Sequence, residues 1–318
     1  MIRKKISRIY LLIWMWLSIS VTFLKADNLN TLHQINCFSM ETLEDSTLWE
    51  GLAGTFFGKQ ENRFIMAGGS AFPGGKPWQD GIKHFSDQVF VFEQLPDGSF
   101  SKVYQGNDLP VPLAEGSYST LPGGLLCVGG LTPDGITGKS WLLAYSGSGI
   151  TVTEYPSLPV PVKNSTATVI GSKVYLVGGE LADGTSTDQF LVLDLSNPTK
   201  GWEKLPNFPV PVSGATLTSQ QDGEEVALFS FGGRARRTAG EATIFYASVY
   251  HFRPSLNRWT QKGDIQHDED TSVSLAMATA SAVGGSHVLL YGGDTGHIFN
   301  QVEKAVREGN TEIGRAHV

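Results

Sequence analysis

Short apolar runs that end in a pair of glycines recur along the chain. The five runs occupy residues 63–69, 125–130, 174–179, 228–233 and 288–293. The first glycines of successive pairs are 61, 49, 54 and 60 residues apart. Self-similarity at a period of this length is the signature of a fold built from repeated structural units. The pattern therefore predicts an internal repeat.

Each repeat carries the same four elements in the same order. A strand of small residues comes first, the glycine-pair strand second, an aromatic strand third after a polar loop, and a fourth strand last, marked in two repeats by a tryptophan. Examples are residues 51–56 and 165–170 for the first strand, 88–92 and 247–252 for the third, and Trp202 and Trp259 for the fourth. Four short strands per repeat form one antiparallel blade. The sequence predicts an all-β protein, a kelch-type β-propeller.

The residue types fit the positions that a propeller gives them. Small residues on the first strand suit a crowded central channel, where neighbouring blades converge. Paired glycines let two backbones approach closely or adopt a positive φ angle. Large aromatic side chains then fill the space between blades.

A more specific stretch follows the first glycine pair. Residues 67–83, which come after 51–54, resemble the N-acetylneuraminate epimerases, the sialic acid mutarotases, and the order of blades resembles the cyclically permuted branch of that family. Residues 291–300 resemble a family loop that carries Ile-Phe-Asn. The resemblance spans about residues 36–311.

The resemblance implies a six-bladed kelch propeller, whereas five glycine pairs are present. Residues 38–43 resemble the outermost strand of a further blade, so about five blades are expected here, with the last blade truncated. Residues 312–318 resemble the translation of a common sequencing adapter. We therefore expect an incomplete propeller over 27–311 and a non-native tail over 312–318, the alternative being an ordinary polar tail.

The first residues predict an export signal. Arg3, Lys4, Lys5 and Arg8 precede the apolar run 9–24, and a polar stretch begins near Asp27. This order is typical of a signal peptide, here residues 1–26, and predicts a periplasmic or otherwise secreted protein with no stable membrane span after cleavage. A retained anchor and a lipidated N-terminus are the alternatives.

Charge and cysteine content narrow the function classes. The formal net charge is −7 and no dense basic patch is visible, which argues against a nucleic-acid partner. Cys37 and Cys127 are the two cysteines, and Cys127 lies in an apolar run where a buried thiol is usual. His267 and His297 are not spaced with acids as in a metal site, so neither a metal nor a cofactor is predicted.

The resemblance implies an isomerase that interconverts N-acetylneuraminate anomers, with a sugar acid as its small-molecule partner. Such chemistry needs a proton-transfer group and a cation for the carboxylate. The family supplies a Glu and an Arg from a Gly-Glu, Pro-Gly, Arg pattern, which we expect in the missing blade. Gly179-Glu180 begins similarly, but Ser186 stands where the Arg would be, so Glu180 is expected to be an ordinary loop acid. Without that pair, the chain is expected to be inactive.

Arginines after the fourth glycine pair are candidates for binding the substrate. Arg234, Arg236 and Arg237 stand where a loop can face the channel mouth, and a guanidinium binds a carboxylate through two hydrogen bonds. Arg234 is preferred because it is nearest to the glycines. An ion-paired cluster is the alternative. Glu241 is either a proton-transfer group or the surface partner of an arginine.

Three further candidates come from the stretches that resemble the family. Lys83 and Trp78 lie in the first stretch, where Trp78 either stacks on a sugar ring or packs against the next blade. Asn300 either binds a sugar hydroxyl or the N-acetyl group, or stabilises a turn. The sequence thus predicts a sialic acid mutarotase; the alternative is a noncatalytic kelch propeller that binds a glycan or a protein, because the fold hosts both.

Overall fold

The computed structural model describes residues 51–75, 79, 81–238, 241–268 and 270–309. All described residues belong to one compact unit. The signal peptide, the strand expected over 38–43 and the tail over 312–318 lie outside the described residues and stay predictions. Within the described ranges, no helix is both long enough and apolar enough to cross a bilayer.

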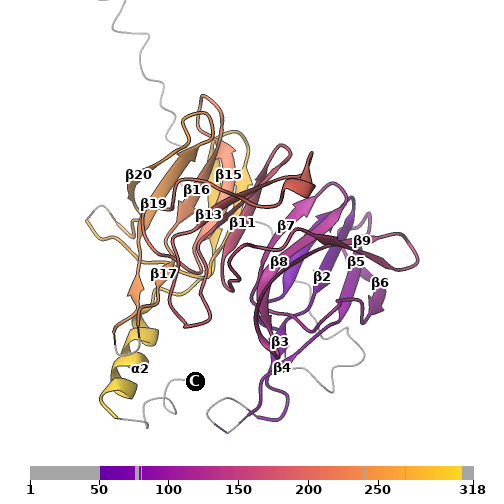
Figure 1. Ribbon diagram of the computed structural model, residues 1–318, viewed down its shortest axis with the longest axis horizontal. Coiled ribbons are helices and arrows are strands. Elements are labelled where there is room, and N and C mark those ends of the chain that lie inside the picture. Colours follow the sequence, from indigo (N-terminus) through magenta and orange to yellow (C-terminus); the bar gives the residue numbers. More distant parts are fainter. Residues whose placement is uncertain (1–50, 76–78, 80, 239–240, 269, 310–318) are drawn as a thin grey trace, which may run out of the picture. The chain divides into compact units, whose positions relative to one another are not determined.

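Four antiparallel sheets of four strands follow one another along the chain (Figure 1), and we call them blades 1 to 4. Their strands are β1 (Phe56–Gln60), β2 (Arg63–Ala67), β5 (Val89–Gln94) and β6 (Phe100–Gly106); β7 (Ser117–Leu121), β8 (Gly124–Thr132), β9 (Gly135–Tyr145) and β10 (Ile150–Tyr155); β11 (Thr166–Ile170), β12 (Lys173–Val177), β13 (Phe190–Asp194) and β14 (Glu203–Lys204); β15 (Thr216–Gln221), β16 (Val226–Phe231), β19 (Ser248–Arg253) and β20 (Arg258–Asp264). Blade 5 consists, in the described part, of β21 (Thr279–Val283) and β22 (His287–Tyr291). The predicted order of small, glycine-pair, aromatic and outer strands is confirmed.

The first strands of the blades lie next to one another. β1 contacts β7, β7 contacts β11, β11 contacts β15, and β15 contacts β21. This is how blades meet at the centre of a propeller. One predicted boundary is wrong: the first strand begins at Phe56 rather than Gly51, because Gly54 has a φ of 67° and interrupts the extended backbone.

The glycine pairs permit close contact between successive blades. The N–H of Gly179 donates to the Val212 carbonyl, which belongs to the linker into the next blade, at 2.8 Å. A Cβ on Gly178, whose φ is 65°, would overlap that same carbonyl oxygen. The pair at Gly232 and Gly233 repeats both features. The predicted role of the glycines is confirmed.

Aromatic side chains fill the space between blades, as the sequence predicts. The rings of Phe190 in blade 3 and Phe252 in blade 4 lie edge to face, with centroids 4.8 Å apart. Trp259 packs against Phe208 at the same separation, and all four side chains are buried. Between blades 1 and 2, the rings of Tyr104 and Tyr145 are 5.6 Å apart. Burial of such large apolar faces holds neighbouring blades together.

A line of backbone hydrogen bonds joins the blades at their inner ends. One residue per blade, just before the first strand, has a left-handed conformation: Gly54, Glu115, Asn164, Gly214 and Met277, with φ between 52° and 67°. The N–H of each donates to the carbonyl of its counterpart in the preceding blade, at 2.9, 2.6, 2.8 and 2.7 Å from Glu115 to Met277. These bonds fix the linker segments that carry Glu115 and Lys163.

Three additional elements follow glycine pairs. Strands β17 (Arg234–Ala235) and β18 (Ile244–Phe245) form a small hairpin that extends from blade 4. Strands β3 (Ser70–Ala71) and β4 (His84–Phe85) pair in the same place on blade 1. After the fifth pair comes α2 (His297–Arg307), whose first turn lies in the stretch 291–300 that resembles a family loop. The segment contains no Gly or Pro, and Phe299, Val302 and Val306 recur at helical spacing. In Figure 1, α2 lies beside β17.

Candidate functional site

The residue that directly follows each glycine pair faces a residue of the linker before the first strand. The bridged pairs are Ser70 with Ala53, Leu131 with Ala114, Glu180 with Lys163, Arg234 with Ser213, and Asp294 with Ala276. The first two blades therefore place small or apolar residues here, and blades 3, 4 and 5 place charged ones. The repeat thus brings charged residues from separate blades to the same end of the first strands, which we call the rim.

Glu180 is the most buried charged group of this rim, with a side chain that is 1% exposed. Its Oε1 atom accepts hydrogen bonds from Arg234 Nη2 at 3.1 Å and from Ser213 Oγ at 3.3 Å. Its Oε2 atom lies 3.6 Å from Lys163 Nζ and 3.8 Å from Arg236 Nη1, and accepts no hydrogen bond within the described part. The expectation of an ordinary loop acid is wrong, because a carboxylate buried this deeply requires surrounding cations.

Arg234 is held from two directions. One edge of its guanidinium meets Glu180, and its face lies 5.3 Å from the centroid of the Phe299 ring in α2. Its side chain is 14% exposed, and its Nε atom is buried without a hydrogen-bond partner in the described part of the chain. Arg234 therefore adopts the ion-paired arrangement that the sequence left as an alternative.

A second carboxylate extends the set of charges. Glu115 accepts a hydrogen bond from Lys163 at 2.8 Å and another from Lys83, and it also lies at the inner end of blade 2. Burial alone would raise the pKa of Glu115, but the hydrogen bonds and charges of Lys163 and Lys83 outweigh it and lower that pKa. Lys163 thus bridges two carboxylates, since its Nζ atom also lies 3.6 Å from Glu180.

We call these groups the rim cluster: Lys83, Glu115, Lys163, Glu180, Arg234 and Arg236. Four cations and two carboxylates give it a formal charge of +2, whereas the whole chain carries −7. A local excess of positive charge in an acidic protein favours an anionic ligand.

Glu115 and Lys163 were not predicted from the sequence. Each stands in a linker between blades, at 114–116 and 163–165, where neither follows a glycine pair. The available signal was positional: each lies just before a first strand, as Gly54 and Ser213 do in their own repeats. The equivalent linker positions of the repeats therefore place the charges of Glu115 and Lys163 on the same side of the fold.

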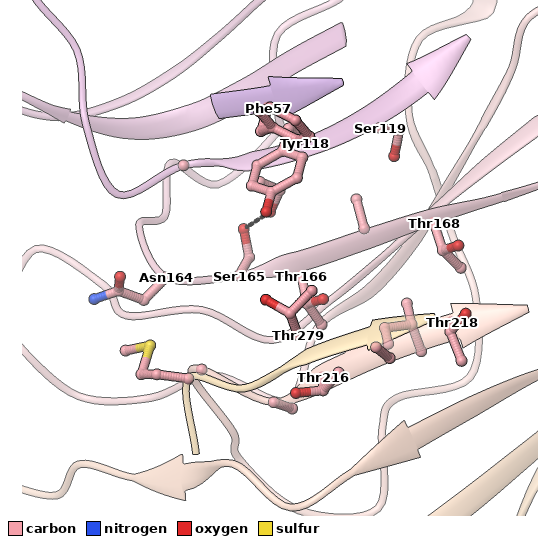
Figure 2. A pocket seen from close by; sticks show the side chains of 18 of the residues that line it. Phe57, Tyr118, Ser119, Asn164, Ser165, Thr166, Thr168, Thr216, Thr218 and Thr279 are labelled. Carbon is pink, nitrogen blue, oxygen red and sulfur yellow. Dashed lines mark hydrogen bonds between the residues drawn. The ribbon is translucent and has the colours of Figure 1, made fainter. Parts of the chain in front are cut away.

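The first strands enclose a cavity of about 700 Å³ beside the rim cluster. Figure 2 shows its lining of hydroxyl side chains, among them Ser165, Thr166, Thr168, Thr216, Thr218 and Thr279. The hydroxyls of Ser117 and Ser165 are 2.5 Å apart. Glu115 lines the same cavity, so the hydroxyl-lined channel and the rim cluster adjoin. Hydroxyl groups that both donate and accept hydrogen bonds suit a polyhydroxylated ligand.

A smaller hollow of about 350 Å³ lies between α2 and the β17–β18 hairpin. We call it the α2 hollow; its lining residues are Arg236, Arg237, Thr238, Glu241 and Thr243 from the hairpin, and Phe299, Val302, Glu303, Val306 and Arg307 from α2. Arg236 and Phe299 touch both the hollow and the charged groups of the rim cluster. The two features are therefore continuous.

Of the remaining sequence candidates, Glu241 and Asn300 make their contacts away from Glu180. Glu241 pairs with Arg237 at 3.5 Å with both side chains more than half exposed, which confirms the surface-partner alternative. Asn300 is exposed in the first turn of α2, where its backbone N–H donates to Gly296 at 2.9 Å. Trp78 lies outside the described residues.

Cys127 is fully buried in β8, and burial raises the pKa of its thiol, so the predicted buried thiol is confirmed. Among the residues that the structure describes, no three His, Cys, Asp or Glu side chains come together in a way that could hold a metal ion.

The chain is similar in sequence to a known protein family and to several of its members. A family model described as N-acetylneuraminate epimerase matches residues 155–315, which include Glu180 and Arg234. The curated N-acetylneuraminate epimerase of Vibrio vulnificus is 36% identical over 148 residues, which are 46% of this chain and 35% of that protein. The N-acetylneuraminate epimerase of Brucella suis is 29% identical over 161 residues, 50% of this chain and 38% of that protein. The matches thus span little more than a third of these relatives.

A solved structure, titled "Structure of YjhT", is similar in fold. It superposes with a TM-score of 0.59 at 15% identity, over 76% of this chain and 77% of that one. This likeness confirms the all-β, kelch-type propeller fold.

Proposed function

The chain belongs to the N-acetylneuraminate epimerase family, and we propose that it interconverts the anomers of N-acetylneuraminate by opening and closing the sugar ring. The observation that carries the proposal is the buried Glu180 carboxylate in contact with Arg234, inside a cluster of net positive charge. Because the matches cover little more than a third of the curated relatives, the activity of this chain is a proposal.

Ring opening requires a base for the anomeric hydroxyl and an acid for the ring oxygen. In our proposal the Glu180 carboxylate accepts the anomeric proton while the Lys163 ammonium, 3.6 Å from Glu180 Oε2, donates a proton to the ring oxygen. The bond between the anomeric carbon and the ring oxygen breaks, and an open-chain ketone forms. Rotation of the ketone and reversal of both proton transfers close the ring with the other configuration, so the protein ends unchanged.

The substrate carboxylate is bound by arginine. Arg236 has a side chain that is 43% exposed and lies 3.8 Å from Glu180 Oε2, a looser contact than that of Arg234. A carboxylate that binds Arg236 through two hydrogen bonds competes with Glu180 for this guanidinium. Binding would then draw Arg236 away and uncover Oε2, which explains how so deeply buried an acid meets a substrate. The chain was expected to be inactive because it lacks a Glu and Arg pair, but such a pair, Glu180 and Arg234, lies within the described residues.

The order of residues near the start of the sequence bears on where the protein is located. We also propose that the protein is periplasmic or otherwise secreted, because four basic residues precede the apolar run 9–24 near the start of the sequence.

The test is the rate at which an α-enriched solution of N-acetylneuraminate relaxes to its equilibrium mixture, followed by proton NMR with and without the protein. Acceleration that disappears in Glu180→Gln supports the mutarotase. Binding of the sugar without acceleration contradicts it and favours the noncatalytic glycan-binding propeller.

A further inference from the structure

The α2 hollow has no part in the proton transfers proposed above, although it adjoins the groups that carry them out. Arg236 lines the hollow and lies 3.8 Å from Glu180 Oε2. Phe299 lines it and covers Arg234. A substrate whose carboxylate reaches Arg236 therefore has another substituent within reach of this hollow.

The charged groups around the hollow are already paired with one another. Arg237 lies 3.5 Å from Glu241, and Arg307 lies 3.4 Å from Glu303. Glu303 also accepts hydrogen bonds from the backbone N–H and the hydroxyl of Thr243, at 2.9 and 2.7 Å. The bonds from Thr243 to Glu303 fix α2 to the β17–β18 hairpin, and the two ion pairs leave little free charge facing a ligand.

What remains on the α2 side is an apolar surface. Phe299, Val302 and Val306 recur at helical spacing and line the hollow together, and Val306 is 61% exposed. Exposed apolar groups next to a polar site gain free energy when an apolar group of a ligand covers them. Such a surface suits a small apolar substituent rather than a hydroxyl or a carboxylate.

We propose that the α2 hollow binds the acylamino substituent of the sugar acid, with the acyl carbon atoms against Val302 and Val306. This inference rests on the proposed function, from which the substrate is taken. The carboxylate of the substrate goes to arginine and its hydroxyls suit the hydroxyl-lined channel, so the acyl group is the one apolar part that remains. The hollow thereby selects 5-acylamino sugar acids over the analogue with a hydroxyl at the same carbon.

Two variants fill the hollow. Val302→Phe and Val306→Phe each place a ring in it; the second side chain is exposed, so its replacement leaves the core intact. Ile298→Phe is the matched control, because Ile298 is on the same helix, 46% exposed and not part of the lining. For N-acetylneuraminate we expect kcat/KM to fall by about tenfold in both filling variants, the scale on which a hydrophobic pocket discriminates. For the 5-hydroxy analogue we expect no change, and Ile298→Phe should resemble the unmodified chain with both sugars.

A binding measurement keeps the inference separate from catalysis. The methyl α-glycoside of N-acetylneuraminate cannot open its ring, so saturation-transfer NMR reports its contacts whether or not the protein is an enzyme. We expect strong saturation of the acetyl methyl protons with the unmodified chain and weak saturation with Val306→Phe.

The outcomes separate the two claims. If mutarotation of N-acetylneuraminate is accelerated but filling the hollow slows both sugars equally, or neither, the acyl site is overturned and the proposed function stands. If no sugar acid is accelerated but the acetyl methyl is saturated in a Val306-dependent way, the proposed function fails and the acyl site stands. Absence of methyl saturation with the unmodified chain overturns the acyl site.

Discussion

Glu180 and Arg234 occupy the same position in successive repeats, directly after a glycine pair, and their side chains meet at 3.1 Å. The glycines set this distance, because they allow each strand to run against the linker of the next blade. A carboxylate from blade 3 and a guanidinium from blade 4 are therefore brought together by the repeat itself. The site depends on the packing of two blades, neither of which contains it alone.

Replacing the carboxylate of Glu180 tests the proposed base. In Glu180→Gln the shape is kept and the proton acceptor is lost, so we expect the rate of mutarotation to fall by about a hundredfold or more, the usual contribution of a general base. Proton NMR measures the rate, and the thermal unfolding midpoint checks the fold. The matched control is Glu241→Gln, an exposed acid beside Arg237 that should leave the rate unchanged. A Glu180→Gln variant as fast as the unmodified chain would remove Glu180 from the mechanism.

Phe299 is expected to act as a positioning residue through Arg234. Its ring covers the guanidinium at 5.3 Å, a contact worth about 0.5–2 kcal/mol in proteins. Phe299→Leu should lower kcat for the sugar acid several-fold, because a displaced Arg234 no longer holds the Glu180 carboxylate in place. Phe299→Tyr keeps an aromatic face over Arg234 and should restore kcat. Equal loss in both variants would indicate a packing role only.

The repeat and the order of strands could be predicted because they depend on local features: glycine pairs, small first strands and aromatic third strands. The role of Glu180 could not, because it was judged by comparison with a single linear pattern in which Ser186 replaces an arginine. The cation that meets Glu180 comes instead from Arg234, 54 residues later. Packing between blades 3 and 4 brings these two residues together, and no local pattern in the sequence indicates this contact.

Helix α2 was missed for a related reason. Its sequence has helical spacing, but its Ile-Phe-Asn segment resembled a loop of the family, and that resemblance led to the prediction of a loop. The structure places Phe299 over Arg234 and holds Glu303 at Thr243, contacts that stabilise the helix on blade 4. The local sequence of this segment is compatible with a helix or a loop, and its contacts with blade 4 stabilise the helix.

Gly178 should be far less replaceable than a glycine with the same backbone angle elsewhere. Its φ is 65°, and a Cβ there would overlap the Val212 carbonyl; Gly171 has a φ of 59° and open space around it. We expect Gly171→Ala to cost about 1 kcal/mol, the ordinary penalty for a left-handed residue. Gly178→Ala should cost about 3 kcal/mol or more, since it also separates two blades. Urea unfolding of both variants measures the difference, and equal costs would show that the close approach is unimportant.

Glu115 predicts how stability depends on pH. Lys163 and Lys83 lower the pKa of this carboxyl in the folded protein below its ordinary value. A depressed folded-state pKa means that the ionised group stabilises the fold above the unfolded value, and that this stabilisation is lost as the pH falls through the folded pKa. Glu115→Gln should therefore lower the unfolding midpoint at pH 7, and the difference from the unmodified chain should shrink steadily below about pH 4. Thermal unfolding at several pH values measures this, with Glu241→Gln as an exposed control. A difference that stays constant across this range would show that the lysines do not stabilise the charged form of Glu115.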